Sequence, residues 1–315
     1  MHFKRYARPL AAAAIALPML AACGGSDNNN DPTTRSTQFG QVTGVIDTGA
    51  SGTLSWKGIP YAKAPVGTLR WKAPVDPDTW TTARSAKSFA PACVQYGRIY
   101  GPGANNTWDA TVGTTLNQAV GAEDCLYLNV WRPANDTGNL PVIVFYHGGS
   151  NVSGYTADPV YDGANLARTA NAVVVTVNFR LGIFGFLNLP QLKTGDAAND
   201  SGNFAILDSI KALQFVNRNI ANFGGDPNNV TIMGQSAGAI NVYALMTSPQ
   251  LANASPKLFH KSVPLSGGLS LASNLPAGSI PTMSPASTYL LQGNALLKQT
   301  LVADGRATDA TVDAY

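Results

Sequence analysis

The chain alternates between two hydrophobic periods, one typical of strands and one typical of helices. Two continuous apolar runs, 141–146 and 172–177, have the length and composition of strands that are buried on both faces. Between residues 204 and 220 the apolar positions instead recur at steps of three and four, which predicts an amphipathic helix. These positions are Leu207, Ile210, Leu213, Val216 and Ile220, and Asn203 precedes them as a candidate N-cap.

Shorter segments continue this alternation. Residues 41–46 and 52–56 predict the strands of an antiparallel hairpin, and residues 123–131 predict a further strand. A short strand at 262–266 and a helix at 287–302 follow. Because strands alternate with helices, the pattern favours the α/β class, with a mainly parallel central sheet and flanking helices.

One strand–turn–helix segment carries the chemistry. Val230–Met233 predicts a short strand, Gly234 interrupts it, and Ala237–Met246 predicts a helix, with Ser236 at the turn. A serine between small residues at such a turn is typical of a nucleophile elbow. The turn forces a strained backbone that only small neighbours tolerate, and it exposes the hydroxyl beside the N–H groups of a helix N-terminus.

The start of the chain has the composition of an export signal. Three basic residues precede Pro9–Leu20, an apolar stretch too short to span a bilayer. The following Ala21-Ala22-Cys23 completes a segment that resembles the lipobox of bacterial lipoproteins, in which the cysteine after the cleavage site is lipidated. We therefore expect residues 1–23 to be a lipoprotein signal with Cys23 as the lipidated residue, and residues 24–37 to be a polar tether. An ordinary cleaved signal that contains a cysteine is the alternative.

Composition and charge exclude several classes of partner. With 315 residues, 45% hydrophobic and 12% charged, the chain can bury a sizeable core. The net charge of +3 is accounted for by Lys4, Arg5 and Arg8 of the export signal. We therefore expect no nucleic-acid partner. No cofactor or metal is expected either, and a dehydrogenase is disfavoured because no G-x-G-x-x-G follows a strand.

Two cysteines beyond the export signal, Cys93 and Cys125, predict a disulfide. They are the only others in a chain that we expect to be exported, and oxidising compartments favour such bonds. Two buried free thiols are the alternative. A thiol enzyme is disfavoured because neither cysteine has a histidine nearby in the sequence.

Seven motifs in a consistent order resemble the type B carboxylesterases, the cholinesterase-like branch of the α/β-hydrolases. The resemblance implies an α/β-hydrolase fold over residues 38–315, with the C-terminal part missing. Besides the elbow, the motifs are Gly58-Ile59-Pro60-Tyr61-Ala62, Glu123-Asp124-Cys125-Leu126-Tyr127-Leu128-Asn129, His147-Gly148-Gly149, Asn178-Phe179-Arg180-Leu181-Gly182, Gly202-Asn203 with Asp208, and Phe223-Gly224-Gly225-Asp226-Pro227.

The resemblance implies a serine esterase site. Ser236 would be the nucleophile, and backbone N–H groups of Ala237 and of Gly148-Gly149-Ser150 would form the oxyanion hole. Ser150 stands where the family has a third glycine, and Gln235 replaces the glutamate that usually precedes the serine.

Other residues in these motifs predict structural roles. His147 precedes the serine, which is the wrong order for a base in this fold, so we expect it to support the oxyanion turn. Arg70 with Glu123, and Arg180 with Asp208, resemble two family ion pairs that hold the surrounding loops.

The remaining members of a triad are not recognisable. His260 is the only histidine after Ser236, and no Asp or Glu lies between them. Asp304, Asp309 and Asp313 all follow His260, whereas the fold requires the order Ser, acid, His. We therefore expect the chain to be an N-terminal portion of an esterase, a truncated product or half of a split pair, inactive by itself.

Two functions follow from this sequence. The first is an exported, lipid-anchored serine hydrolase on the periplasmic or outer-membrane face, acting on a small carboxylic ester through an acyl-enzyme on Ser236. The membrane would be a partner through the lipid anchor only. The alternative is a non-catalytic, cholinesterase-like adhesion module, which is less favoured because such domains often lose the serine elbow that is intact here.

Overall fold

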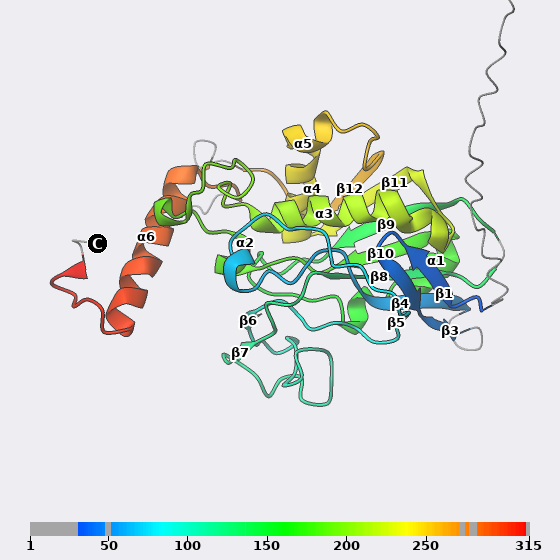
Figure 1. Ribbon diagram of the computed structural model, residues 1–315, viewed down its shortest axis with the longest axis horizontal. Coiled ribbons are helices and arrows are strands. Elements are labelled where there is room, and N and C mark those ends of the chain that lie inside the picture. Colours follow the sequence, from blue (N-terminus) through cyan, green and yellow to red (C-terminus); the bar gives the residue numbers. More distant parts are fainter. Residues whose placement is uncertain (1–30, 48–51, 136, 271–274, 277–281, 313–315) are drawn as a thin grey trace, which may run out of the picture. The chain divides into compact units, whose positions relative to one another are not determined.

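The computed structural model describes residues 31–312 except 48–51, 136, 271–274 and 277–281. The predicted signal, Cys23 and most of the predicted tether lie outside the described residues. Figure 1 labels the helices and strands.

A mixed sheet of seven strands forms the centre of the described chain. Its order is β12 (Lys261–Leu265), β11 (Gly225–Gln235), β9 (Leu140–Tyr146), β10 (Val173–Val177), β8 (Tyr127–Pro133), β4 (Thr53–Pro60) and β3 (Val45–Asp47). The pairings among β12, β11, β9 and β10 are parallel. Those among β10, β8, β4 and β3 are antiparallel. The expectation of a mainly parallel sheet therefore describes only the half that carries Ser236.

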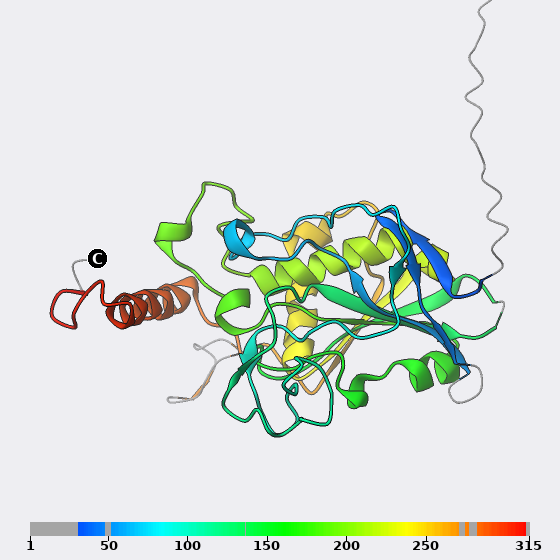
Figure 2. The same ribbon diagram turned by 60° about the horizontal axis from the view of Figure 1, so that its bottom comes forward.

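Helices cover both faces of this sheet. α3 (Phe204–Asn219) and α4 (Ala237–Thr247) contact each other and β11, whereas α1 (Ala164–Ala170) contacts β8, β10 and β4. Figure 2 shows α1 and α3 on opposite faces. The other helices are α2 (Gly182–Gly185), α5 (Pro249–Ala252) and α6 (Ala286–Ala303), and short 3-10 turns lie at Gly67–Leu69 (η1), Pro159–Tyr161 (η2), Pro190–Leu192 (η3) and Ile220–Phe223 (η4).

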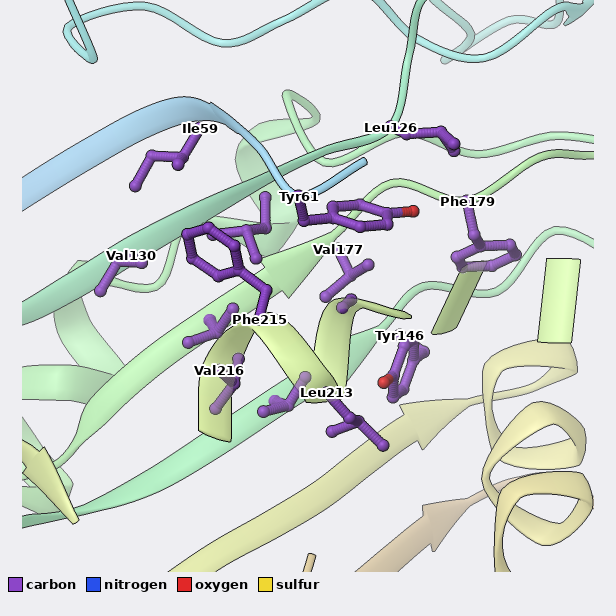
Figure 3. Close-up of a cluster of buried hydrophobic side chains, with 14 of the residues drawn as sticks. Ile59, Tyr61, Leu126, Val130, Tyr146, Val177, Phe179, Leu213, Phe215 and Val216 are labelled. Carbon is purple, nitrogen blue, oxygen red and sulfur yellow. The ribbon is translucent and has the colours of Figure 1, made fainter. Parts of the chain in front are cut away.

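The core lies between α3 and the sheet. Leu213, Phe215 and Val216 of α3 are buried, and Figure 3 shows them among side chains of the strands. Every residue of β10 is buried, because its run of valines and one threonine is covered on both faces. The helix predicted for residues 204–220 agrees with α3 to within one residue. The side chain of Asn203 does not cap this helix, contrary to the prediction.

Small sheets lie outside this centre. β1 (Thr34–Thr37), β2 (Gly40–Thr43) and β5 (Arg84–Ser85) form one, and β6 (Gln95–Tyr96) and β7 (Ala119–Val120) form another. The predicted hairpin is correct only in part: β3 pairs with β4, but β2 pairs with β1.

The tether was predicted too long, because β1 lies within residues 24–37. The carbonyl of Ser36 accepts a hydrogen bond of 2.8 Å from Asn222, and the N–H of Gln38 donates one of 2.7 Å to Asn219. These contacts with the end of α3 and with η4 hold a segment whose polar composition alone suggested a free linker.

Candidate active site

Ser236 lies between the last residue of β11 and the first residue of α4. Its backbone has φ 56° and ψ −122°, in the region that non-glycine residues rarely occupy. A Cβ atom on Gly234 would lie 2.2 Å from the carbonyl oxygen of Gly238, and one on Gly238 would lie 2.1 Å from that of Tyr146. The sharp turn around Ser236 is therefore possible only with glycine at both positions.

The glycine-rich turn after β9 lies directly against this elbow. β9 and β11 are parallel neighbours with Tyr146 opposite Gly234, so the turns that follow them meet at one edge of the sheet. A Cβ atom on Gly148 would lie 3.1 Å from Cβ of Ser236 and 2.9 Å from the carbonyl oxygen of Gln235. Glycine at position 148 thus allows the turn to approach the serine.

Backbone donors lie on both sides of Ser236. Ala237 is the first residue of α4, so its N–H precedes the first helical hydrogen bond. In the part of the chain that the structure describes, the N–H groups of Gly148, Gly149 and Ser150 donate to no backbone carbonyl, and that of Gly148 interacts with the hydroxyl of Tyr161. Such donors next to a nucleophile can bind the oxyanion of a tetrahedral intermediate.

An amide pair that sequence analysis missed holds the glycine turn on α4. The side chain of Asn151 donates to Asn241 over 3.0 Å, and Asn241 donates back over 2.9 Å. Ser150 and Asn151 both have positive φ, 56° and 55°, and the carbonyl of Asn151 accepts a 2.7 Å hydrogen bond from Gly182. No sequence signal joins two asparagines that lie ninety positions apart.

His147 is a buried packing residue beside the turn. Its side chain is 1% exposed, its ring stacks on Phe179 with centroids 4.6 Å apart, and Nδ1 lies 2.8 Å from the carbonyl oxygen of Gly148. Burial lowers the pKa of His147 to about 4, so the ring is neutral near pH 7. This arrangement agrees with the structural role predicted for it.

His260 lies just before β12, beside Val230 in the middle of β11 and away from Ser236. Its N–H donates to the carbonyl of Val230 over 2.8 Å, and its Nδ1 accepts from the N–H of Val230 over 3.2 Å. Ser236 follows the end of β11, about 20 Å farther along the strand at the usual rise per residue. Among the described residues, the hydroxyl of Ser236 makes no hydrogen bond with a histidine or a carboxylate.

Both predicted ion pairs are present, and they differ in exposure. Nη2 of Arg180 lies 2.7 Å from Asp208, with side chains 3% and 0% exposed. Nε of Arg70 lies 2.5 Å from Glu123, with side chains 37% and 22% exposed. Oδ2 of Asp208 also accepts a hydrogen bond of 3.1 Å from the backbone N–H of Arg180, so the buried pair fixes the chain just after β10.

The sulfurs of Cys93 and Cys125 lie 2.02 Å apart, the distance of a disulfide. The segment that they close contains β6 and β7. It also forms one wall of a cavity of about 480 Å³, whose other wall is the turn after β9. The cavity is lined by Gln95, Arg98, Ile99, Tyr100, Gly101, Leu116, Gly148, Gly149, Ser153, Gly154, Tyr155, Asp158 and Tyr161.

Within the described residues, no group of three or more His, Cys, Asp or Glu side chains is close enough to hold a metal ion. The same residues contain no helix with the length and apolar character to cross a membrane.

The sequence model of the carboxylesterase family matches residues 31–278. The chain belongs to the carboxylesterase family. Its mixed sheet and elbow are those expected of the α/β-hydrolase fold of that family, as the resemblance implied.

Curated relatives in this family are esterases of bacteria and mammals. The chain is 41% identical to para-nitrobenzyl esterase of Bacillus subtilis, a match that covers 73% of this chain and 43% of the relative. It is 39% identical to fumonisin B1 esterase of Sphingopyxis macrogoltabida, over 81% of the chain and 43% of the relative. Liver carboxylesterase 1 of Oryctolagus cuniculus is 38% identical over 82% and 44%. The chain thus spans less than half the length of these relatives.

Solved structures that resemble this chain are also esterases, and the chain again covers less than half of each. A PNB esterase matches with a TM-score of 0.62 and 38% identity, covering 76% of this chain and 45% of that one. A carboxylesterase of Geobacillus stearothermophilus matches with a TM-score of 0.60 and 40% identity, over 73% and 43%.

Proposed function

We propose that this protein is a serine carboxylic ester hydrolase that works through an acyl-enzyme on Ser236. The observation that carries the proposal is the meeting of a strained serine elbow with a glycine turn, where Gly148 has no room for a Cβ atom beside Ser236. Family membership supports the same chemistry.

The geometry supports a two-step reaction. The hydroxyl oxygen of Ser236 attacks the ester carbonyl carbon, and the carbonyl oxygen becomes an oxyanion that accepts hydrogen bonds from N–H groups of Ala237 and of the Gly148–Ser150 turn. The intermediate then expels the alcohol, which takes up the proton that the serine lost. Water cleaves the resulting acyl-enzyme and releases the acid.

The proton in these steps needs a base that the described residues do not provide near Ser236. His147 is held in packing contacts, and His260 lies beside Val230, six residues before Ser236 along β11. We therefore propose that the base and its acid partner lie outside the described residues, and that the 315-residue chain is inactive alone. A serine hydroxyl is a weak nucleophile without a base.

Hydrolysis of a short-chain nitrophenyl ester tests this function. The natural protein, isolated from its source cells with an antibody against this chain, should turn over the ester, and Ser236→Ala should abolish turnover. The purified 315-residue chain should not exceed its own Ser236→Ala control. Strong turnover by that chain, verified by intact mass, would contradict the assignment of the base to another part.

A non-catalytic binding module is the second candidate. It is favoured by one observation, that the hydroxyl of Ser236 has no histidine partner in the described part of the chain. Folded natural protein that binds a cell-surface partner but shows no Ser236-dependent turnover would support this candidate and reject the esterase.

We also propose that the protein is exported and anchored through lipid on Cys23, with a small ester as its substrate and no nucleic-acid partner. The lipobox-like sequence before Cys23 supports the anchor. Cys23→Ala should move the protein from the membrane fraction to the soluble fraction or block its processing. A membrane fraction unchanged in the variant would reject the anchor.

The disulfide is proposed to form in the exported protein. Mass spectrometry of unreduced material should recover the peptides of Cys93 and Cys125 linked together. Recovery of both as free thiols would contradict it.

A further inference from the structure

The cavity beside the glycine turn has the position and size of a substrate site. Gly148, which lines it, would place a Cβ atom 3.1 Å from Cβ of Ser236, so the residue that packs against the proposed nucleophile also forms part of the cavity wall. Its volume of about 480 Å³ is within the range of pockets that hold small organic ligands. An ester bound at Ser236 can therefore extend one of its two sides into this space.

Two charged side chains line the cavity, Asp158 and Arg98, and only Asp158 makes a hydrogen bond with the described residues. Oδ1 of Asp158 accepts the N–H of Val160 over 3.0 Å, which caps the turn Pro159–Tyr161. The guanidinium of Arg98, in contrast, makes no ion pair, side-chain hydrogen bond or aromatic stack with the described residues. Arg98 is exposed to solvent, so its charge is available to a ligand.

Two tyrosines of the cavity, Tyr155 and Tyr161, are neutral near pH 7. Burial, together with the charge of Asp158, raises the pKa of Tyr155 and of Tyr161 well above neutral pH. Tyr100 is 72% exposed, and Ile99 and Leu116 add apolar surface. The cavity thus combines the unpaired cation of Arg98 and the carboxylate of Asp158 with tyrosine rings and apolar side chains.

We propose that this cavity selects esters that carry a second, free carboxylate, and that Arg98 binds this carboxylate. The inference rests on the proposed esterase function, because it places the scissile ester at Ser236. Guanidinium groups bind carboxylates through two parallel hydrogen bonds, which makes an unpaired arginine in a substrate cavity a specific recognition element. Esters of dicarboxylic acids with one acid group left free have this chemistry.

A matched pair of ligands tests the proposal without needing catalysis. Monobenzyl adipate carries a free carboxylate, and benzyl methyl adipate differs only in having a methyl ester in its place. Calorimetric titration of both into the Ser236→Ala form of the 315-residue chain, which cannot form an acyl-enzyme, should show about tenfold tighter binding of the acid. Circular dichroism confirms that each variant is folded.

Variants separate Arg98 from general charge effects. Arg98→Gln should remove the preference for the acid, and Arg98→Lys should keep part of it, because an ammonium group lacks the planar fork. Arg168→Gln is the control, since Arg168 is an exposed arginine on α1 that bonds to Asn165. It should leave the preference unchanged.

Three results would overturn the proposal. These are equal binding of the acid and the diester, an acid preference that survives Arg98→Gln, and no saturable binding of the acid up to about millimolar concentration. They are distinguishable from failure of the esterase function, because binding is measured in a chain without the nucleophile. A protein that never hydrolyses esters would still show the preference if Arg98 binds carboxylates.

Discussion

The two ends of the paired segment of β11 and β12, Thr231–Gln235 against Lys261–Leu265, have opposite characters. At the carboxyl end, Gly234, Gly238 and Gly148 have no room for a side chain around Ser236. Asp208 is fully buried and binds Arg180, which follows the carboxyl end of β10. At the amino end, His260 is exposed, and its hydrogen bonds within the described part of the chain are with one strand residue, Val230. A strained backbone turn keeps its conformation only when tightly packed neighbours hold it, whereas a surface turn does not need such neighbours.

This difference explains where chemistry is to be expected. The carboxyl edge of a sheet collects the turns that follow parallel strands, so backbone donors and a nucleophile from β9 and β11 meet there. The amino edge brings His260 no such neighbours. Variants at the two ends should therefore differ strongly in their effect on stability.

The largest loss is expected at the carboxyl edge, in the buried ion pair. Asp208→Asn leaves the Arg180 charge without its partner in a site only 3% exposed, where Nη1 of Arg180 already has no hydrogen-bond partner among the described residues. We expect the free energy of unfolding to fall by about 3–5 kcal/mol. Denaturant unfolding measures it.

Glu123→Gln is the matched control for this loss. Arg70 and Glu123 are 37% and 22% exposed, so solvent screens their attraction and the variant should lose about 1 kcal/mol or less. Equal losses in the two variants would show that burial does not set the difference between these pairs.

The next effect concerns the pH dependence of stability. The pKa of His147 is lowered to about 4 by burial, below its ordinary value, so the unfolded chain binds this proton more readily. The contribution is fully present above the unfolded pKa and is lost as the pH falls towards the folded one. Between pH 7 and pH 5 it should lower stability by about 2 kcal/mol.

His147→Gln removes this proton-binding site and serves as the comparison. Unfolding measured at several pH values should give a smaller decline in the variant than in the parent chain. Parallel profiles for the two chains would show that His147 is not buried in its neutral form.

A smaller effect is expected for the amide pair on the glycine turn. Asn241→Ala leaves the Asn151 amide without its partner, although half-buried Asn151 can reach water, so we expect a loss of about 1–2 kcal/mol. The two single alanine variants and the double variant form a cycle that measures the coupling between the residues. Purely additive losses would mean that the two amides do not support each other.

The smallest effect is expected at His260, at the amino end of the pairing between β11 and β12. His260→Gln should change the free energy of unfolding by no more than about 0.5 kcal/mol, because the side chain is exposed and makes one contact with the backbone. It should also leave ester turnover by the natural protein unchanged. A large loss of turnover would identify His260 as the missing base and reject its separation of about 20 Å from Ser236.

Much of this architecture was predictable because local patterns encode it. The valines of β10, the helical period of α3 and the glycines around Ser236 each predict one element from neighbouring residues alone. What the sequence did not show depends on contacts between distant segments. The pairing of Asn151 with Asn241, the strand β1 within the expected tether, and the cavity between the disulfide-closed segment and the glycine turn are all of this kind.

We expect Ser236 to be an activated nucleophile in the natural protein, and covalent labelling tests this most directly. Natural protein isolated from its source cells is treated with a fluorophosphonate, and the modified peptide is identified by mass spectrometry. We predict modification at Ser236, at a rate far above that of other serines and abolished by heat unfolding. Folded protein whose Ser236 peptide is recovered entirely unmodified would contradict this expectation.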